Sequence, residues 1–410
     1  MSAINLYRGL FELLTAPDGS AASAITLETT RAARREVLIV ARKEGCLPEL
    51  YARWEPAGLL SPAESVEHDQ FARQRASVAD VLRILPSRSL LAGAAGLPCA
   101  WGTVDVLLPD FAAIGSLHEA VGRLGYRMEG AGEWLVPLRD PMHRGVASFR
   151  YARAALSESA VGIEVQVAGV PIDERRNVPF ADLAEHATRL DGLACRALEP
   201  TRQLLHCIAT FGAQAAPVTV RQIADVHLLL KAHIRRIDHG WLQRQVDQLD
   251  VWTGLRQLRD AIVAKRLSAL LSWGEFGRMI EISATRADAV ATQRARAPRF
   301  GTLVRNAFGL LRQPRGDDVV ARLARNPWLV TRVLGAGYRV RGLPVLGKPF
   351  DAPKFLRVDG ALYLATGAGL ILLSLVDLSD GAQAELGERV RTGSRPVVLA
   401  RWTGAKVRAR

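Results

Sequence analysis

Cysteine and histidine are scarce in this chain, which has 4 cysteines and 8 histidines among 410 residues. No two cysteines have Cys-x-x-Cys spacing, and no histidines form a His-x-x-x-His pair. The sequence therefore offers no zinc site of the usual spacing and no disulfide framework. Free, scattered cysteines are typical of a reducing compartment, so we expect a cytoplasmic protein.

Long apolar runs are also lacking. The longest run, Ala361–Val376, is interrupted by threonine, glycine and serine. It is shorter than the ~20 residues that an α-helix needs to span a bilayer, and it predicts two buried strands joined by a glycine turn. The segment Met1–Arg8 has no basic start followed by an apolar core, so we expect no signal peptide.

Positive charge is present in excess, but it is concentrated in one region. Residues 299–410 hold 19 Lys and Arg against 8 Asp and Glu, which gives this segment +11 of the net charge of +13. Two basic amphipathic stretches within it, Leu303–Leu311 and Val319–Val333, are typical of helices that bind an anionic membrane surface or a nucleic acid. The same pattern also fits the solvated face of helices that pack on a core.

The pattern of apolar residues divides the chain into four regions. We expect a helical region over 1–85 and a helical domain over 173–298. Between them, residues 86–172 alternate short apolar runs with turns and one helix, Phe111–Leu124, which predicts a small mixed sheet of the α/β (α+β) class flanked by helices. Residues 299–410 form the basic C-terminal extension, in which we expect helices and strands, the latter at Arg357–Leu364, Leu370–Leu375 and Pro396–Trp402.

Two helix starts can be placed from local chemistry. Ser61 followed by Pro62 and Glu64 has the spacing of a capping box, and Thr219 stands where a second helix should begin. The segment Arg31–Lys43 is rich in Ala, Arg and Leu, and this composition also predicts a helix.

One segment of the α/β region points to chemistry. An apolar strand at Leu90–Leu91 runs into a small-residue turn with Gly93 and Ala94, and the strand that follows carries Asp105 between apolar neighbours. In such a turn the backbone N–H groups can approach phosphates, while an acidic side chain on the next strand can bind Mg²⁺. Thr103 occupies the first position of what would be an Asp-x-Asp pair.

The order of these motifs resembles an uncharacterised bacterial nucleotidyltransferase family of the DNA-polymerase-β-like superfamily. The family is often found in natural-product and surface-polysaccharide gene clusters. The resemblance covers roughly residues 30–275. It rests on four blocks, namely Ala41–Pro48 with the helix that follows, Leu91–Gly93 with the Asp105 strand, Val161–Gln166, and Leu198–Pro200 with Leu204–Cys207 and Ile223–Val226.

The resemblance implies a polymerase-β-like core that binds a nucleoside triphosphate and Mg²⁺. Asp105 and Glu164 would be the metal-binding and catalytic acids, and Gly93, Ala94 and Thr103 would face the nucleotide. The implied reaction transfers a nucleotidyl group to a small molecule or a peptide.

Several positions depart from the family pattern, so a second interpretation stays open. Thr103 replaces the first aspartate, Ala92 stands where the family often has lysine, and Gln166 stands where it often has histidine. The alternative is a catalytically degraded fold that serves as a binding or accessory protein in a biosynthetic pathway.

Individual residues have structural alternatives as well. Glu164 is also compatible with a solvent-facing acid on an edge strand, and Asp105 with an acid satisfied by local donors. His206 and Asp225 fit polar anchors between packed helices better than catalytic groups. His143 is a loop histidine that could contact phosphate.

Overall fold

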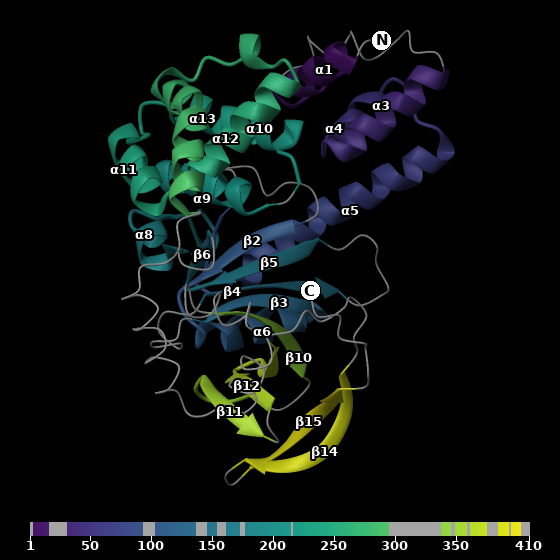
Figure 1. The fold of residues 1–410 in the computed structure, drawn as a ribbon. Coiled ribbons are helices and arrows are strands. Elements are labelled where there is room, and N and C mark those ends of the chain that lie inside the picture. The colour runs from purple at the N-terminus through teal and green to yellow at the C-terminus, as the bar shows by residue number, and fades with distance from the viewer. Residues whose placement is uncertain are drawn as a thin grey trace.

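The structure is a computed structural model of the chain (Figure 1). It describes residues 3–15, 31–92, 103–136, 146–153, 161–172, 177–214, 216–294, 338–345, 349–358, 361–374, 384–392 and 395–402. The helices are α1 (Ala3–Thr15), α3 (Arg31–Lys43), α4 (Leu47–Trp54), α5 (Pro62–Ile84), α6 (Ala113–Arg123), α8 (Phe180–Ala184), α9 (Pro200–Ala213), α10 (Val220–His233), α11 (His239–Leu249), α12 (Trp252–Ala264) and α13 (Gly274–Arg294), with a 3₁₀ turn at Ser268–Leu270.

The strands are β1 (Leu90–Leu91), β2 (Thr103–Leu108), β3 (Tyr126–Val136), β4 (Val146–Arg153), β5 (Gly162–Val167), β6 (Gly169–Pro171), β7 (Asn177–Pro179), β8 (Thr188–Arg189), β9 (Arg196–Ala197), β10 (Tyr338–Val345), β11 (Lys354–Val358), β12 (Ala361–Thr366), β13 (Gly369–Ser374), β14 (Ala384–Thr392) and β15 (Arg395–Trp402).

One mixed sheet organises the described part of the chain. Its 11 strands follow the order β11-β12-β13-β10-β3-β4-β5-β2-β1-β9-β8. The central pair β2 and β5 is parallel, whereas β4 pairs antiparallel with β5 and β1 antiparallel with β2. A mixed sheet flanked by helices confirms the expected α/β class.

The central strands bury one face completely and the other only in part. Val104, Val106 and Leu108 of β2 alternate with residues of the opposite face and pack in one core with α6 and the end of α5. Leu107 points the other way and joins a second core, which is formed largely by helices. The sheet therefore lies between α5 and α6 on one side and the helical region around α9 on the other (Figure 1).

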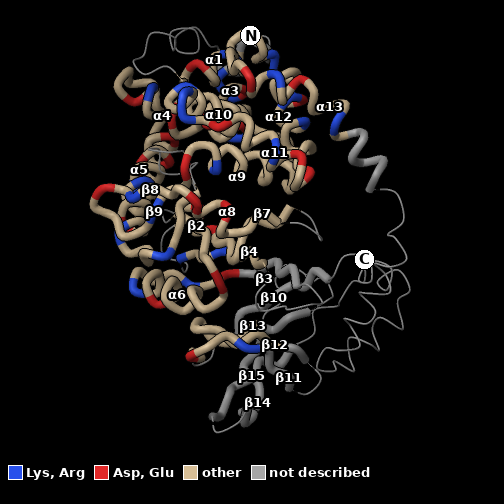
Figure 2. Tube along the Cα trace, turned by 90° about the vertical axis from the view of Figure 1, so that its left-hand side faces the viewer, with Lys and Arg blue, Asp and Glu red and all other residues tan. Residues whose placement is uncertain are grey.

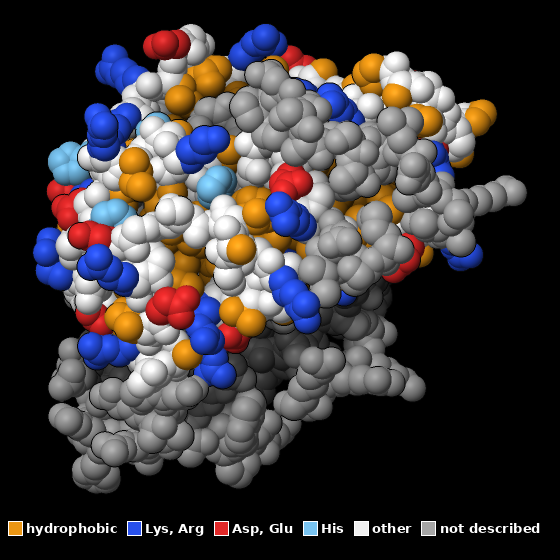
Figure 3. All heavy atoms as spheres, turned by 90° about the horizontal axis from the view of Figure 1, so that it is seen from above, with side chains coloured by type: hydrophobic (Ala, Val, Ile, Leu, Met, Phe, Trp, Pro, Cys, Tyr) orange, Lys and Arg blue, Asp and Glu red, His pale blue; other side chains and the backbone are white. Residues whose placement is uncertain are grey.

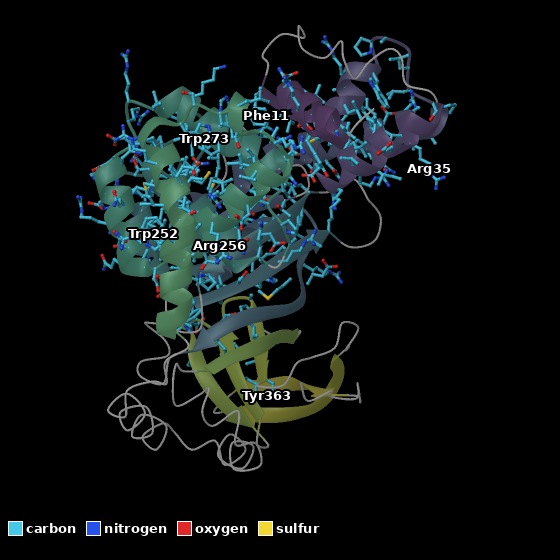
Figure 4. The ribbon with its side chains drawn as sticks, turned by 45° about the horizontal axis from the view of Figure 1, so that its top comes forward. Phe11, Arg35, Trp252, Arg256, Trp273 and Tyr363 are labelled. Atoms are coloured by element: carbon cyan, nitrogen blue, oxygen red, sulfur yellow. The ribbon has the colours of Figure 1, made fainter. Side chains whose placement is uncertain are left out.

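The helical region is held together by aromatic as well as aliphatic contacts. Phe11 of α1 meets the ring of His227 edge-on at 5.4 Å, and the indole Nε1 of Trp273 donates to Nδ1 of that histidine at 3.1 Å. Figure 4 shows Phe11 and Trp273 in this part of the molecule. The N-terminal helix α1 is thereby joined to the helices that follow the sheet.

Both expected helix caps are present. The Ser61 backbone N–H donates to the Glu64 carboxylate at 2.7 Å, and the Glu64 N–H donates to the Ser61 hydroxyl at 3.4 Å. Thr219 forms the same reciprocal arrangement with Gln222 at the start of α10. These two starts are confirmed because a capping box depends on residues three positions apart.

The C-terminal strands belong to the same sheet as the α/β region. β10 pairs antiparallel with β3, so the sheet crosses the expected boundary at residue 298. At Gly115 of α6, an added methyl group would lie 2.8 Å from the α-carbon of Gly367, which shows that helix and hairpin touch through their backbones. Tyr363, Leu364 and Ile371 are buried, and Figure 4 shows Tyr363 at the lower strands.

Two expectations for the C-terminal region have clear outcomes. The run Ala361–Val376 forms two paired strands, β12 and β13, joined by a turn with glycine, as expected. The single strand predicted over Arg357–Leu364 is wrong, because these residues belong to two strands, β11 and β12, that pair antiparallel. The two basic amphipathic stretches, at 303–311 and 319–333, lie outside the described residues.

Charges are mixed over the described part of the chain. Figure 2 shows Lys and Arg interleaved with Asp and Glu along the helices, and Figure 3 shows the same mixture on the upper face. None of the helices that the structure describes combines the length and the apolar character that crossing a membrane requires.

Candidate functional site

The two acids singled out from the sequence are direct neighbours in the sheet. In the parallel pairing of β2 with β5, Asp105 lies opposite Glu164, and Thr103 lies opposite Gly162. Register partners point to the same face of a sheet, and neighbouring strands are about 4.8 Å apart. The two carboxylates therefore share one face, and they are close enough to contact a common ligand.

The position of β5 removes one alternative for Glu164. This strand pairs with β2 on one side and with β4 on the other, so it is an internal strand. An acid on an edge strand would be explained by solvent alone. An internal carboxylate that keeps a side-chain exposure of 38% lies instead on a part of the sheet face that helices leave open.

Asp105 is the more enclosed of the two acids. Burial raises the pKa of this carboxyl to about 7, and the negative charge of Glu164 adds to the increase. Near neutral pH Asp105 is therefore divided between its charged and neutral forms. The pKa of Glu164 is also raised by burial, and the positive charge of Arg150 counteracts that increase.

Arg150 completes the polar row across the three strands. It lies on β4 directly opposite Glu164, and its Nε is 3.6 Å from a carboxylate oxygen of Glu164. The row Arg150, Glu164, Asp105 thus holds one cation and two carboxylates, one of them half protonated near pH 7. Its net charge is much less negative than that of a site with three free carboxylates.

Helix α9 covers the other end of this face. The ring of His206 lies 3.4 Å from the side-chain oxygen of Gln166, which is two residues beyond Glu164 on β5. Burial lowers the pKa of His206 to about 4, so the ring is neutral. His206 is therefore a polar anchor between helix and sheet, as the structural alternative predicted.

Cys207, the next residue on α9, is influenced by the charges of two acids, Asp105 of the sheet and Asp225 of helix α10. Burial raises the pKa of its thiol to about 12, and the charges of Asp225 and Asp105 add to this effect. A thiol with so high a pKa is no nucleophile at neutral pH.

Asp225 belongs to a different cluster. Its carboxylate accepts from Nε of Arg221 at 3.2 Å, and Arg221 also pairs with Glu49 of α4. Burial raises the pKa of Asp225 to about 6, although Arg221 lowers it. This ionic cluster joins α10 to α4, which supports a structural role for Asp225.

The remaining sequence candidates fall in different places. Thr103 is described and lies half-buried on the same face as Asp105. Gly93, Ala94 and His143 lie outside the described residues. Within the described ranges, no group of three His, Cys, Asp or Glu side chains is close enough to hold a metal ion by itself.

Arg150 and Gly162 were missed in the sequence. Alternation along β4 places Arg150 among buried Phe149 and Tyr151, so a polar face could have been recognised. Gly162 begins a strand in which β-branched residues alternate with polar ones, and a glycine in a strand is a signal for close approach of another group. Neither signal identifies the partner strand. The pairing of β4 with β5 is what brings Arg150 close to Glu164 and Gly162.

No protein-family model matches the sequence, and no curated protein matches it.

Proposed function

We propose that the chain is a nucleotidyltransferase-like protein that binds a nucleoside triphosphate and Mg²⁺ on the face of Asp105 and Glu164. The observation that carries the proposal is the register of β2 and β5, which places these two carboxylates side by side on one face. The resemblance to polymerase-β-like nucleotidyltransferases supplies the class of ligand.

The residues present fit a metal ion that is shared with a ligand. Mg²⁺ in phosphate-binding proteins is commonly held by one or two carboxylates, with phosphate oxygens and water completing the coordination. Asp105 and Glu164 provide two such carboxylates, and the Thr103 side chain provides a neutral oxygen nearby. When bound, Mg²⁺ would neutralise charge on the phosphates.

The proposed binding requires Asp105 to be ionised. Its raised pKa means that a proton must leave the carboxyl before it can bind a cation. Glu164 must likewise be shared between the cation and Arg150. Binding should therefore strengthen as the pH rises through about 7.

Transfer would use the same face. The acceptor oxygen of a small molecule or peptide would form a bond to the α-phosphorus, and the bond to the pyrophosphate oxygen would break. Glu164 is the side chain of the pair with the larger exposure to solvent, and it would accept the proton of the acceptor hydroxyl.

A second candidate function is binding without transfer. Two observations favour it, namely Thr103 at the position of an acid and the ion pair that occupies Glu164. Both reduce the negative charge available to a divalent cation. A protein of this kind would bind a nucleotide or a related phosphate compound as an accessory component of a biosynthetic pathway.

Isothermal titration with ATP, GTP, CTP and UTP, each with and without Mg²⁺, tests the proposed binding. Asp105→Asn should abolish the gain in affinity that Mg²⁺ provides. Asp110→Asn is the matched control, because Asp110 follows the same strand but is half-exposed and paired with Arg88, and asparagine can still accept the Ala113 N–H. An equal effect of both substitutions, or no effect of Mg²⁺ on the wild-type protein, would contradict the proposal.

Release of pyrophosphate then separates the two candidates. The wild-type protein with an NTP and a mixture of hydroxyl-bearing acceptors should release pyrophosphate if transfer occurs. Thr103→Asp should increase nucleotide affinity in both cases, because it adds a carboxylate next to Asp105. Tight binding with no pyrophosphate release from the wild type would favour the accessory function.

A further inference from the structure

The guanidinium of Arg150 lies flat over a glycine of the neighbouring strand. A methyl group added at Gly162 would be 2.8 Å from Nη2, 3.0 Å from Nε and 3.2 Å from Cζ of Arg150. The guanidinium therefore occupies the space in which any other residue at 162 would place its side chain. Gly162 is in turn the register partner of Thr103, so this space adjoins the face of Asp105.

The ends of this guanidinium are available to a ligand. The side chain of Arg150 is 49% exposed, and its Nε lies 3.6 Å from a carboxylate oxygen of Glu164. In the part of the chain that the structure describes, its terminal nitrogens make no hydrogen bond. Arginine carries five N–H donors, so most of them remain for another partner.

Among protein side chains, arginine is the one whose fork of donors matches the oxygens of a phosphate group. We propose that Arg150, seated over Gly162, binds the phosphate groups of the ligand next to the Asp105–Glu164 pair. The inference rests on the proposed function and deepens it, because it assigns the polyphosphate to a protein cation as well as to the metal ion.

The row holds one positive side chain, Arg150, and two carboxylates, so it favours a ligand that carries both a polyphosphate and a divalent cation. A polyphosphate without a metal ion would bind to Arg150 but less tightly, because Glu164 and ionised Asp105 weaken the attraction, and a divalent cation alone would be held less tightly because of the charge of Arg150. A ligand that brings both charges satisfies all three side chains. The site is therefore suited to a metal-bound polyphosphate more than to either component.

A purely neutralising role of Arg150 toward Glu164 predicts a different result. If Arg150 only neutralises Glu164, its removal frees a carboxylate and Mg²⁺ should bind more tightly. If Arg150 binds phosphate, its removal should weaken polyphosphate binding. The two roles are separated by measuring the cation and the anion individually.

The experiment uses inorganic tripolyphosphate in the presence of EDTA, and Mg²⁺ alone, with the full chain. Arg150→Gln removes the donors, and Gly162→Ala displaces the guanidinium while leaving residue 150 unchanged. Arg153→Gln is the matched control, because Arg153 is an exposed arginine of the same strand on the opposite face. Thermal unfolding shows whether each variant is folded. If Arg150→Gln does not fold, Arg150→Lys replaces it in the comparison.

We expect Arg150→Gln and Gly162→Ala to weaken tripolyphosphate binding by about tenfold or more, which corresponds to losing a hydrogen bond to a charged group. Arg153→Gln should change it less than about twofold, since it alters only the general charge of the surface. Arg150→Lys should bind at an intermediate level, because lysine keeps the charge without the fork.

Equal weakening by Arg150→Gln and Arg153→Gln would overturn the inference, since it would show attraction to net charge alone. Tighter Mg²⁺ binding with unchanged tripolyphosphate binding would also overturn it. Because the tripolyphosphate titration contains no metal, it tests Arg150 even if Mg²⁺ is found to have no effect on NTP binding.

Discussion

Replacement of Asp105 by asparagine should stabilise the protein at alkaline pH and have little effect in acid. Burial and the charge of Glu164 raise the pKa of Asp105 from 3.8 to about 7. In the unfolded chain an aspartate has a pKa of about 3.9. Between these two values the folded protein binds more protons than the unfolded chain, so its stability falls as the pH rises.

The size of this effect follows from the shift. A change of about 3 pKa units at about 1.4 kcal/mol per unit gives about 4 kcal/mol as an upper limit. Asp105 keeps part of its surface in water, which screens its interactions, and we therefore expect about half of that value. Asparagine has the same shape and no charge, so Asp105→Asn avoids the penalty at high pH.

Thermal unfolding at pH 4.5 and pH 8.5 measures the difference. The midpoint of Asp105→Asn should exceed that of the wild type by a few degrees, about 2–4 °C, at pH 8.5, and the two midpoints should nearly coincide at pH 4.5. Asp110→Asn, at a half-exposed acid outside the site, should follow the wild type at both pH values. A constant difference between Asp105→Asn and the wild type at both pH values would refute the reasoning.

Three further predictions concern binding and packing. The Mg²⁺-dependent affinity for an NTP should be roughly tenfold lower at pH 6 than at pH 8, because a proton must leave Asp105 before it binds a cation. Calorimetric titration at the two pH values measures this difference, and equal affinities would contradict the prediction. Gly254→Ala should lower the free energy of unfolding by about 1–3 kcal/mol, because its methyl group would collide with the backbone carbonyl of Ile208, where α12 crosses α9. Denaturant unfolding measures the loss, and Gly122→Ala is the control, because a methyl group added at Gly122 of α6 meets no atom within 4 Å. Deletion of residues 295–410 should cause aggregation, because it uncovers the edge of β3 and the apolar residues that pack on Leu364 and Ile371. Light scattering measures the aggregation, and a monodisperse truncated protein would show that the C-terminal strands are dispensable.

The local elements of this protein could be predicted from the sequence. The start of α5 at Ser61 and the start of α10 at Thr219 follow from side chains that bond to backbone groups three residues away. The hairpin of β12 and β13 follows from two apolar runs around a glycine turn. Interactions of this kind join residues that are close in sequence, so they can be predicted from the sequence alone.

The candidate site was predictable only in part. Asp105 was identified from its place on a strand after a small-residue turn, and Glu164 through the resemblance. Their proximity depends on the pairing of β2 with β5, which are separated by α6 and two strands. A carboxylate on one strand carries no local signal that names its partner strand.

Tertiary structure alone decided what surrounds the acids. The pairing of β4 with β5 brings Arg150 to Glu164, and the absence of a side chain at Gly162 lets the guanidinium lie on the strand. It also decided that β10 continues the sheet at β3, across 201 residues between Val136 and Tyr338. The sequence by itself determined the caps, the turns and the polar face of each strand, because these arise within a few residues. The charge of the site arises from side chains far apart in the chain, and only folding brings them together.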